Sequence, residues 1–196
     1  MKKKIKQMTV KNKILLHACC GICSSYPIFQ LREMGYEPIV YFYNPNIYPI
    51  EEYNKRVEAE KTLCNSNNCE LVIAKYEPDV YFEKVKGFEQ EPEHGKRCDI
   101  CFEIRLRKSA QYALKSGIDT FTTSIVISPH KNFKLISEIG FKIANDYGLK
   151  YLAIDFKKKD GFLKTNKIAN SLKLYRQNYC GCKFSVRKEE KEWNAV

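Results

Sequence analysis

The sequence predicts one α/β domain, a parallel sheet of about five strands with helices on both faces. Short apolar runs alternate with longer amphipathic stretches along the chain, an order typical of a parallel sheet covered by helices. The 196 residues suit one domain, and a hydrophobic content of 44% is enough for a core. We therefore predict a single domain over residues 13–196, preceded by a basic extension over residues 1–12.

Five apolar runs supply the predicted strands. They cover residues 14–18, 38–43, 71–74, 120–126 and 151–154. Apart from the fourth, which is rich in threonine, each run is short and nearly continuous rather than alternating, as in a strand that is buried on both faces.

The stretches between these runs predict four helices, over residues 24–34, 50–64, 99–116 and 133–146. Ser24 and Ser25 can cap the first helix, and Glu51 and Glu52 suit the N-terminus of the second. A glycine follows the first, third and fourth helices, as is common at a helix end. A last helix is expected between Glu189 and Trp193.

The charge is uneven along the chain. The net charge is +11, of which residues 1–50 carry +5, residues 51–130 carry −2 and residues 131–196 carry +8. Clustered lysines favour a nucleic-acid partner. For the cluster from Lys157 to Lys173, a nucleic-acid surface and an ordinary solvated surface are equally good interpretations of the charge. For the first thirteen residues the solvated surface is the better interpretation. No apolar run is long enough for a membrane span or a signal peptide, so we expect a soluble, cytoplasmic protein.

Nine cysteines are the most unusual feature of the composition. An odd number in a chain of this length argues against a secreted disulfide scaffold and favours metal binding in a reducing compartment. Seven of them fall in three tight groups, which are Cys19, Cys20 and Cys23, then Cys98 and Cys101, and finally Cys180 and Cys182. Cys64 and Cys69 lie apart from these groups, and we expect them to be structural fillers.

Seven thiolates fit one four-cysteine iron–sulfur cluster with three ligands left over. Three protein ligands leave an open position, which a catalytic metal needs to receive a substrate. One structural zinc with spare buried thiols is the alternative, and both remain open on the cysteine count alone.

Three unusual loops follow predicted strands, where the ligands of parallel sheets bind. They are residues 19–23 after the first strand, 44–46 after the second and 128–130 after the fourth. His130 in the third loop could supply a proton or simply start a helix, whereas His17 is expected in the core. The chain has no phosphate-binding P-loop and no dinucleotide fingerprint.

The same segments resemble the cobalamin-independent epoxyqueuosine reductases of the QueH family. The blocks that carry the resemblance are LLHACCGICS at 15–24, YFYNPNI at 41–47, RCDICFEIRL at 97–106, FTT at 121–123 with ISP at 127–129, and YRQNYCGCKFS at 175–185. Two departures are Ile22, where the family usually has proline, and the stretch from Lys157 to Phe162, which is less typical. Residues 1–12 lie outside the resemblance.

This resemblance implies an adenine nucleotide alpha-hydrolase-like (PP-loop) fold in which cysteines replace the phosphate loop. It implies the reductive deoxygenation of epoxyqueuosine to queuosine at the wobble position of tRNA. The implied cofactors are a [4Fe–4S] cluster and an adjacent mononuclear iron, and the implied partners are tRNA and an unidentified electron donor. The iron would act as a Lewis acid on the epoxide oxygen, with electrons arriving through the cluster.

Site roles follow from joining the resemblance to the cysteine count. We expect Cys98 and Cys101 on the cluster, with two more ligands from Cys19, Cys20 and Cys180, and Cys23 and Cys182 on the second metal. The residues expected to bind the substrate are Asn44, Asn46, Ser128, His130, Arg176 and Gln177. Two alternatives stay open: a zinc-stapled RNA-binding module without catalysis, and a cluster-containing tRNA sulfur-transfer enzyme.

Overall fold

The structure is a computed structural model that describes residues 12–186. The expected basic extension, apart from Asn12, and the expected helix between Glu189 and Trp193 lie outside the described residues. Of the helices in residues 12–186, none is both long enough and apolar enough to cross a membrane.

Five strands form one sheet in the order β3-β2-β1-β4-β5, and every pairing is parallel. The strands are β1 (Asn12–Ala18), β2 (Tyr36–Phe42), β3 (Glu70–Ile73), β4 (Thr120–Thr123) and β5 (Lys150–Tyr151). The central strand, β1, is fully buried at Ile14, Leu15 and Leu16, because helices cover both faces of the sheet there. The predicted parallel sheet of five strands is confirmed.

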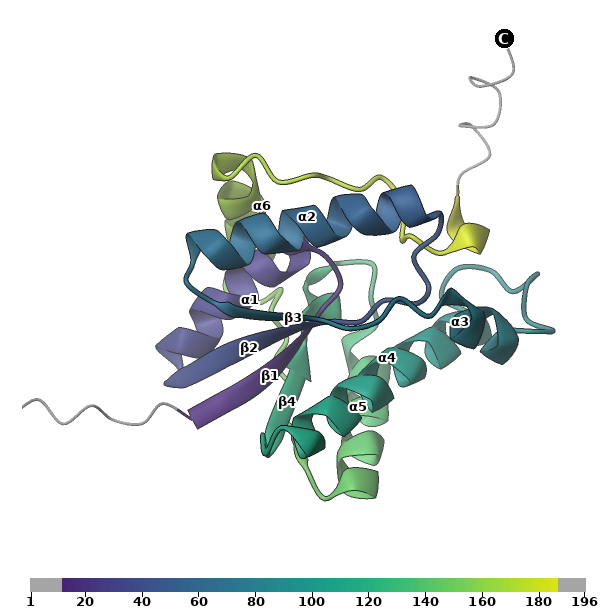
Figure 1. Ribbon diagram of the computed structural model, residues 1–196, viewed down its shortest axis with the longest axis horizontal. Helices are drawn as coiled ribbons and strands as arrows, with labels where there is room; N and C mark the ends of the chain where they lie inside the picture. The colour runs from purple at the N-terminus through teal and green to yellow at the C-terminus, as the bar shows by residue number, and fades with distance from the viewer. Residues whose placement is uncertain (1–11, 187–196) are drawn as a thin grey trace, which may run out of the picture.

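Helices lie on both faces of this sheet (Figure 1). One face carries α1 (Gly21–Glu33), α2 (Ile50–Ser66) and α6 (Gly161–Ser171), and the other carries α4 (Lys96–Lys115) and α5 (Phe133–Tyr147). A short helix, α3 (Pro78–Lys84), precedes α4. After α6, the C-terminal segment runs back along α2 to the loops that follow the strands (Figure 1).

The strand order creates a crevice at the carboxyl ends of β1 and β4. These two strands are neighbours in the sheet, but the chain leaves β1 through α1 on one face and β4 through α5 on the other. At such a switch point the two connections diverge and leave room for a ligand. The loops predicted to carry the site therefore meet at this crevice.

Three expectations about element ends are wrong. The fifth strand, expected over residues 151–154, is Lys150–Tyr151 and ends three residues early. Helix α1 begins at Gly21, so Ser24 and Ser25 lie inside it and bond back to the carbonyl oxygens of Cys20 and Ile22 instead of capping it. The predicted fourth strand ends at Thr123, and residues 124–127 form a 3₁₀ helix. Its apolar residues are buried without joining the sheet, and an apolar run alone does not distinguish the two cases.

Candidate functional site

A cavity of about 470 Å³ opens at the carboxyl edge of β1 and β4. Its lining comes from the loops after β1, β2 and β4, from the N-terminal half of α6 and from the C-terminal segment. The volume falls within the range of small-molecule sites. Segments far apart in the sequence thus form one concave site.

The first thiol group, Cys19, Cys20 and Cys23, lies at the end of β1 and in the first turn of α1. Its three Sγ atoms all lie within 4.8 Å of one another, and among the described residues this is the one group of three metal-type ligands that is so close. Bonds of about 2.3 Å to one tetrahedral ion would keep sulfur atoms about 4 Å apart. The first thiol group therefore fits a single metal ion with one open position.

The charge of the first thiol group is concentrated on one sulfur. Hydrogen bonds from Cys20 and Cys23 lower the pKa of the Cys19 thiol well below its usual range. The bond to Cys19 raises the pKa of Cys20 to about 12. A metal ion would take the place of the protons that Cys20 and Cys23 keep.

The second thiol group is Cys98, Cys101, Cys180 and Cys182. The first two lie one turn apart at the start of α4, and the other two flank Gly181 in the C-terminal segment. All four line one hollow beside the cavity. No three of these sulfurs approach one another as closely as in the first thiol group. This wider spacing fits a cluster of several metal atoms better than a single ion.

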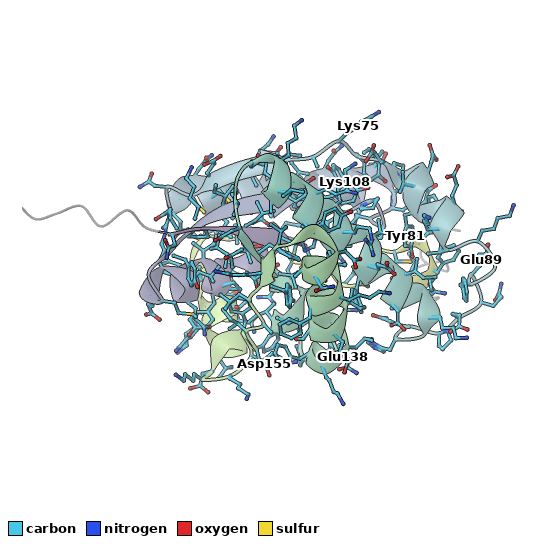
Figure 2. The ribbon with its side chains drawn as sticks, turned by 90° about the horizontal axis from the view of Figure 1, so that it is seen from below. Lys75, Tyr81, Glu89, Lys108, Glu138 and Asp155 are labelled. Atoms are coloured by element: carbon cyan, nitrogen blue, oxygen red, sulfur yellow. The ribbon has the colours of Figure 1, made fainter. Side chains whose placement is uncertain are left out.

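Polar neighbours surround the second thiol group. The Tyr81 hydroxyl lies 2.9 Å from the Cys182 Sγ atom, and Lys131 Nζ lies 3.5 Å from the Cys180 Sγ atom; Tyr81 is labelled in Figure 2. The backbone N–H of His94 donates to Cys98 Sγ over 3.3 Å. Such contacts stabilise thiolate charge and influence the electronic properties of a bound cluster.

Arg56 holds the loop that carries Cys180 and Cys182. The buried Arg56 pairs with Glu52 at 2.7 Å and donates to the carbonyl oxygens of Cys180 and Tyr179 at 3.0 and 3.1 Å. Gly181 has a φ of +101°, and a Cβ atom there would lie 2.8 Å from the guanidinium of Arg56. Only glycine satisfies both the backbone angle and the space.

Arg105 connects the two thiol groups. Its side chain is 4% exposed, lines both hollows, donates to Asn44 Oδ1 at 2.7 Å and lies 4.0 Å from Cys101 Sγ. In residues 12–186 no ion pair joins Arg105 to a carboxylate. Burial raises the pKa of Cys101 to about 12, and the positive charge of Arg105 opposes that rise and also helps to lower the pKa of Cys19. Arg105 is therefore the cation that both thiol groups share.

All six residues expected to bind substrate line the cavity; they are Asn44, Asn46, Ser128, His130, Arg176 and Gln177. The Asn44 amide is already occupied, because it accepts from Arg105 and donates to the Ala18 carbonyl oxygen. Asn46 is buried, and its Oδ1 atom has no hydrogen-bond partner. The two asparagines therefore differ: Asn44 holds Arg105, while Asn46 has a free acceptor.

Arg176 and Gln177 lie side by side in sequence but have different partners. Arg176 is exposed and donates to Asn166 and Asn170 of α6. Gln177 Nε2 lies 2.9 Å from Cys20 Sγ, so this side chain touches the first thiol group. Ser128 and His130 lie at the rim of the cavity after β4.

His17 is a buried structural residue, as expected. Its Nε2 atom faces the Tyr43 carbonyl oxygen, which can only accept, so Nε2 carries the proton and Nδ1 accepts from the Thr123 hydroxyl. Burial, assisted by the charge of Arg105, lowers the pKa of His17 to about 3. The ring is neutral and ties β1 to β4 just below the thiols.

Sequence reasoning missed Tyr81, Arg56 and Lys131, and gave Arg105 no role although it lies in one of the resembling blocks. Each acts through a partner that is distant in the sequence, so no local pattern announces it. A tyrosine or arginine of this kind looks like any core or surface residue until the fold brings it to a thiol.

Comparisons with known proteins agree on one family. A family model described as "Epoxyqueuosine reductase QueH" matches residues 14–188. Proteins named epoxyqueuosine reductase QueH from Staphylococcus epidermidis and Streptococcus pyogenes are 40% and 37% identical over 185 residues. These alignments cover 90% and 91% of this chain and 77% and 72% of the relatives.

The fold is also found in a solved structure. The U34-tRNA thiolase NcsA from Methanococcus maripaludis, described with its [4Fe–4S] cluster, aligns with a TM-score of 0.56 at 15% identity. The alignment covers 93% of this chain and 64% of the thiolase. At that identity the likeness concerns the fold, and it agrees with the expected PP-loop type.

Proposed function

This chain belongs to the epoxyqueuosine reductase QueH family, and from this premise we propose how its residues share the work of the reaction. The enzyme converts epoxyqueuosine to queuosine at the wobble position of tRNA. The reaction adds two electrons and two protons, breaks both C–O bonds of the epoxide, leaves a cyclopentene double bond and releases water. The sequence-based prediction of a reductase is confirmed, and neither alternative function is favoured.

Cys98, Cys101, Cys180 and Cys182 would hold a [4Fe–4S] cluster, and Cys19, Cys20 and Cys23 a single iron. This division differs from the partition expected from the sequence, which mixed the two groups. It is supported by the close spacing of the first thiol group and the wider spacing of the second. When bound, the cluster would supply electrons and the single metal a Lewis acid beside the substrate.

The chain's own residues fix the positions of these thiols and place positive charge beside them. Arg105 supplies positive charge to both groups and is held by Asn44. Lys131 Nζ lies 3.5 Å from the Cys180 Sγ atom, and the Tyr81 hydroxyl shares a hydrogen bond with the Cys182 thiol. Arg56 fixes the backbone on either side of Cys180. Together they hold both thiol groups beside one cavity before any substrate arrives.

The substrate would be the wobble nucleotide of tRNA. It would turn out of the anticodon stack so that its base and the attached epoxide-bearing ring enter the cavity. Chemistry on a nucleobase inside an RNA stack requires such extrusion. Positive charge around the site supports binding of the RNA backbone, with Arg176 exposed at the rim. An electron donor of the cytoplasm would reduce the cluster.

The single observation that carries this proposal is that both thiol groups face one cavity: Cys19, Cys23 and Cys180 all line it. A matched pair of variants tests it. Cys98→Ser should abolish conversion of epoxyqueuosine to queuosine in purified tRNA, followed as the loss of one oxygen by mass spectrometry of nucleosides. Cys64→Ala, a change at a core cysteine outside both groups, should retain conversion. Full activity of Cys98→Ser would contradict the assignment.

A further inference from the structure

One wall of the cavity combines an exposed aromatic ring with buried oxygen atoms that lack partners. Phe162, on α6, lines the cavity and is 40% exposed. Thr165 lies one helical turn later on the same face, lines the cavity and is fully buried. Asn46, in the loop after β2, also lines the cavity. Neither Thr165 Oγ1 nor Asn46 Oδ1 has a hydrogen-bond partner.

Such atoms need an explanation. A buried polar oxygen without a partner destabilises a folded protein, so these atoms are usually satisfied by a ligand or water. Two of them from separate segments, Asn46 after β2 and Thr165 on α6, lie in one cavity. That arrangement suits a ligand that brings N–H or O–H donors.

The rest of the wall suits a flat ring. Ile22 and Ile125 add aliphatic surface to the cavity that Phe162 enters. Single-stranded RNA is recognised largely by stacking its splayed bases on aromatic side chains and by hydrogen bonds to their edges.

The wall is held at a fixed place relative to the first thiol group. Ser25 Oγ, on α1, donates to the backbone oxygen of Thr165 at 3.3 Å, so α6 is tied to the helix that carries Cys23. A Cβ atom at Gly161 would lie 1.7 Å from the Phe156 carbonyl oxygen, and only glycine lets α6 start this close. A ligand ring stacked on the Phe162 side chain would therefore lie at a defined position in the cavity that Cys19 and Cys23 also line.

We infer that Phe162, Thr165 and Asn46 form the subsite for the wobble base, which stacks on the Phe162 ring and donates N–H groups to the two free oxygens. The base of the substrate is a 7-substituted deazaguanine, whose Watson–Crick edge carries N–H donors. This inference rests on the proposed function. It adds the residues that recognise the base, as distinct from those that hold metal or the epoxide ring.

The test measures binding of an anticodon stem-loop with epoxyqueuosine at the wobble position, by fluorescence anisotropy on the iron-loaded enzyme without oxygen. Phe162→Leu should weaken binding about tenfold, the loss expected for one stacked base. Phe162→Tyr keeps the ring and should bind within about twofold of the wild type. Thr165→Val should weaken binding about fivefold through its lost hydrogen bond. Leu163→Ala is the matched control, since Leu163 is 59% exposed and outside the cavity lining.

A second stem-loop with no base at the wobble position identifies what Phe162 touches. The wild type and Phe162→Leu should bind this RNA equally, because the stacked base is missing. An equal loss on both RNAs would overturn the inference, since Phe162 would then contact another part of the RNA. All variants should keep the wild-type iron content, which excludes damage to the metal site.

The outcomes separate this inference from the proposed function. If the wild type reduces the substrate and Phe162→Leu binds it as tightly as the wild type does, the subsite is wrong and the function stands. If the wild type neither binds nor reduces the modified RNA, the proposed function fails and the subsite with it.

Discussion

Arg105 is a buried cation whose anionic neighbours are sulfur atoms. A buried charge needs a partner, and the thiolates of the two groups would take the place of a carboxylate once they hold metal. The positive charge of the guanidinium would therefore be compensated when the site holds metal and its cysteines are thiolates. In the metal-free protein, where most of these thiols keep their protons, the same charge is poorly compensated.

Arg105→Met should consequently separate stability from metal binding. We expect the metal-free variant to lose no more than about 2 kcal/mol, because removal of a poorly compensated charge offsets part of the cost of leaving the buried Asn44 Oδ1 without its donor. Its iron content after anaerobic loading should fall to half or less. Urea unfolding and iron analysis measure the two effects, and unchanged iron content would contradict the role given to Arg105.

His17 makes a prediction about pH. Above pH 6.5 the ring is neutral in both the folded and the unfolded chain, so its titration has no effect. Between pH 6.5 and about pH 3 the unfolded chain binds a proton at His17 that the folded chain does not. The free energy of unfolding therefore falls as the pH is lowered through this range. The slope is about 1.4 kcal/mol per pH unit for one such group.

His17→Gln should remove this contribution. Urea unfolding of the metal-free protein at several values between pH 6 and pH 4.5 gives the slope of the free energy of unfolding against pH for each protein. The slope of the wild type should be steeper by the amount expected for the uptake of about one proton. Parallel slopes would mean that His17 is protonated in the folded state.

At the scale of elements, the site depends on how the C-terminal segment is attached. Tyr175 donates to Glu52 at 2.6 Å, Tyr179 donates to the Tyr48 carbonyl oxygen at 2.7 Å, and Tyr48 N–H donates to Gly181 O at 2.8 Å. An isolated antiparallel bridge joins Ile47 to Cys182. These bonds hold Cys180 and Cys182 at the edge of the sheet, although neither residue lies in a regular helix or strand.

Arg56→Lys should loosen that attachment. Lysine keeps the positive charge beside Glu52 but loses the planar fork that reaches two carbonyl oxygens at once. We expect the free energy of unfolding to fall by about 2–3 kcal/mol and cluster content to fall with it. Arg107→Lys is the control, because Arg107 pairs with Glu103 and Asp146 at the surface, where the effect should be below about 1 kcal/mol.

The elements that the sequence revealed are those with an apolar signal. The buried strands and the long helices α2, α4 and α5 were predicted to within a few residues. Helix α6 was missed because its buried positions are Gly161, Thr165 and Ala169, which give no apolar stripe. Helix α3 is only seven residues long and buries only Tyr81.

The site was predictable where the signal was local. Cysteine spacing and the positions of loops after strands placed Cys19–Cys23, Asn46 and Ser128 at one edge. The division of the seven thiols into two groups was not predictable, because it depends on the path of the C-terminal segment across α2. Arg56 contacts Cys180 across 124 residues of sequence, and no local pattern encodes such a contact.

At the scale of the whole molecule, the net charge of +11 matches an RNA substrate. Lysines gather on α6 and the turn before it, on the same segment that forms a wall of the cavity; they are Lys157, Lys158, Lys159, Lys164 and Lys167. We therefore expect the later lysine cluster seen in the sequence to meet phosphates of the RNA substrate. The cytoplasmic location stays a prediction.

The affinity for tRNA should fall steeply with salt, because lysine contacts to phosphate release counterions. Lys167→Ala should reduce the slope of log affinity against log salt by about one. Lys115→Ala is the control, since Lys115 ends α4 roughly 20–25 Å from the cysteines near its start, and its slope should equal that of the wild type. Filter binding at several salt concentrations measures both, and equal slopes for all three proteins would remove Lys167 from the RNA surface.

The most direct test of two separate metal sites is an analysis of iron, acid-labile sulfide and zinc in protein purified without oxygen. The wild type should contain about five irons and four sulfides, with broad absorbance near 400 nm. Cys23→Ser should lose about one iron and keep its sulfide, whereas Cys182→Ser should lose most of its sulfide. Zinc alone without sulfide would contradict the account, and loss of sulfide in Cys23→Ser would contradict the division of the thiols.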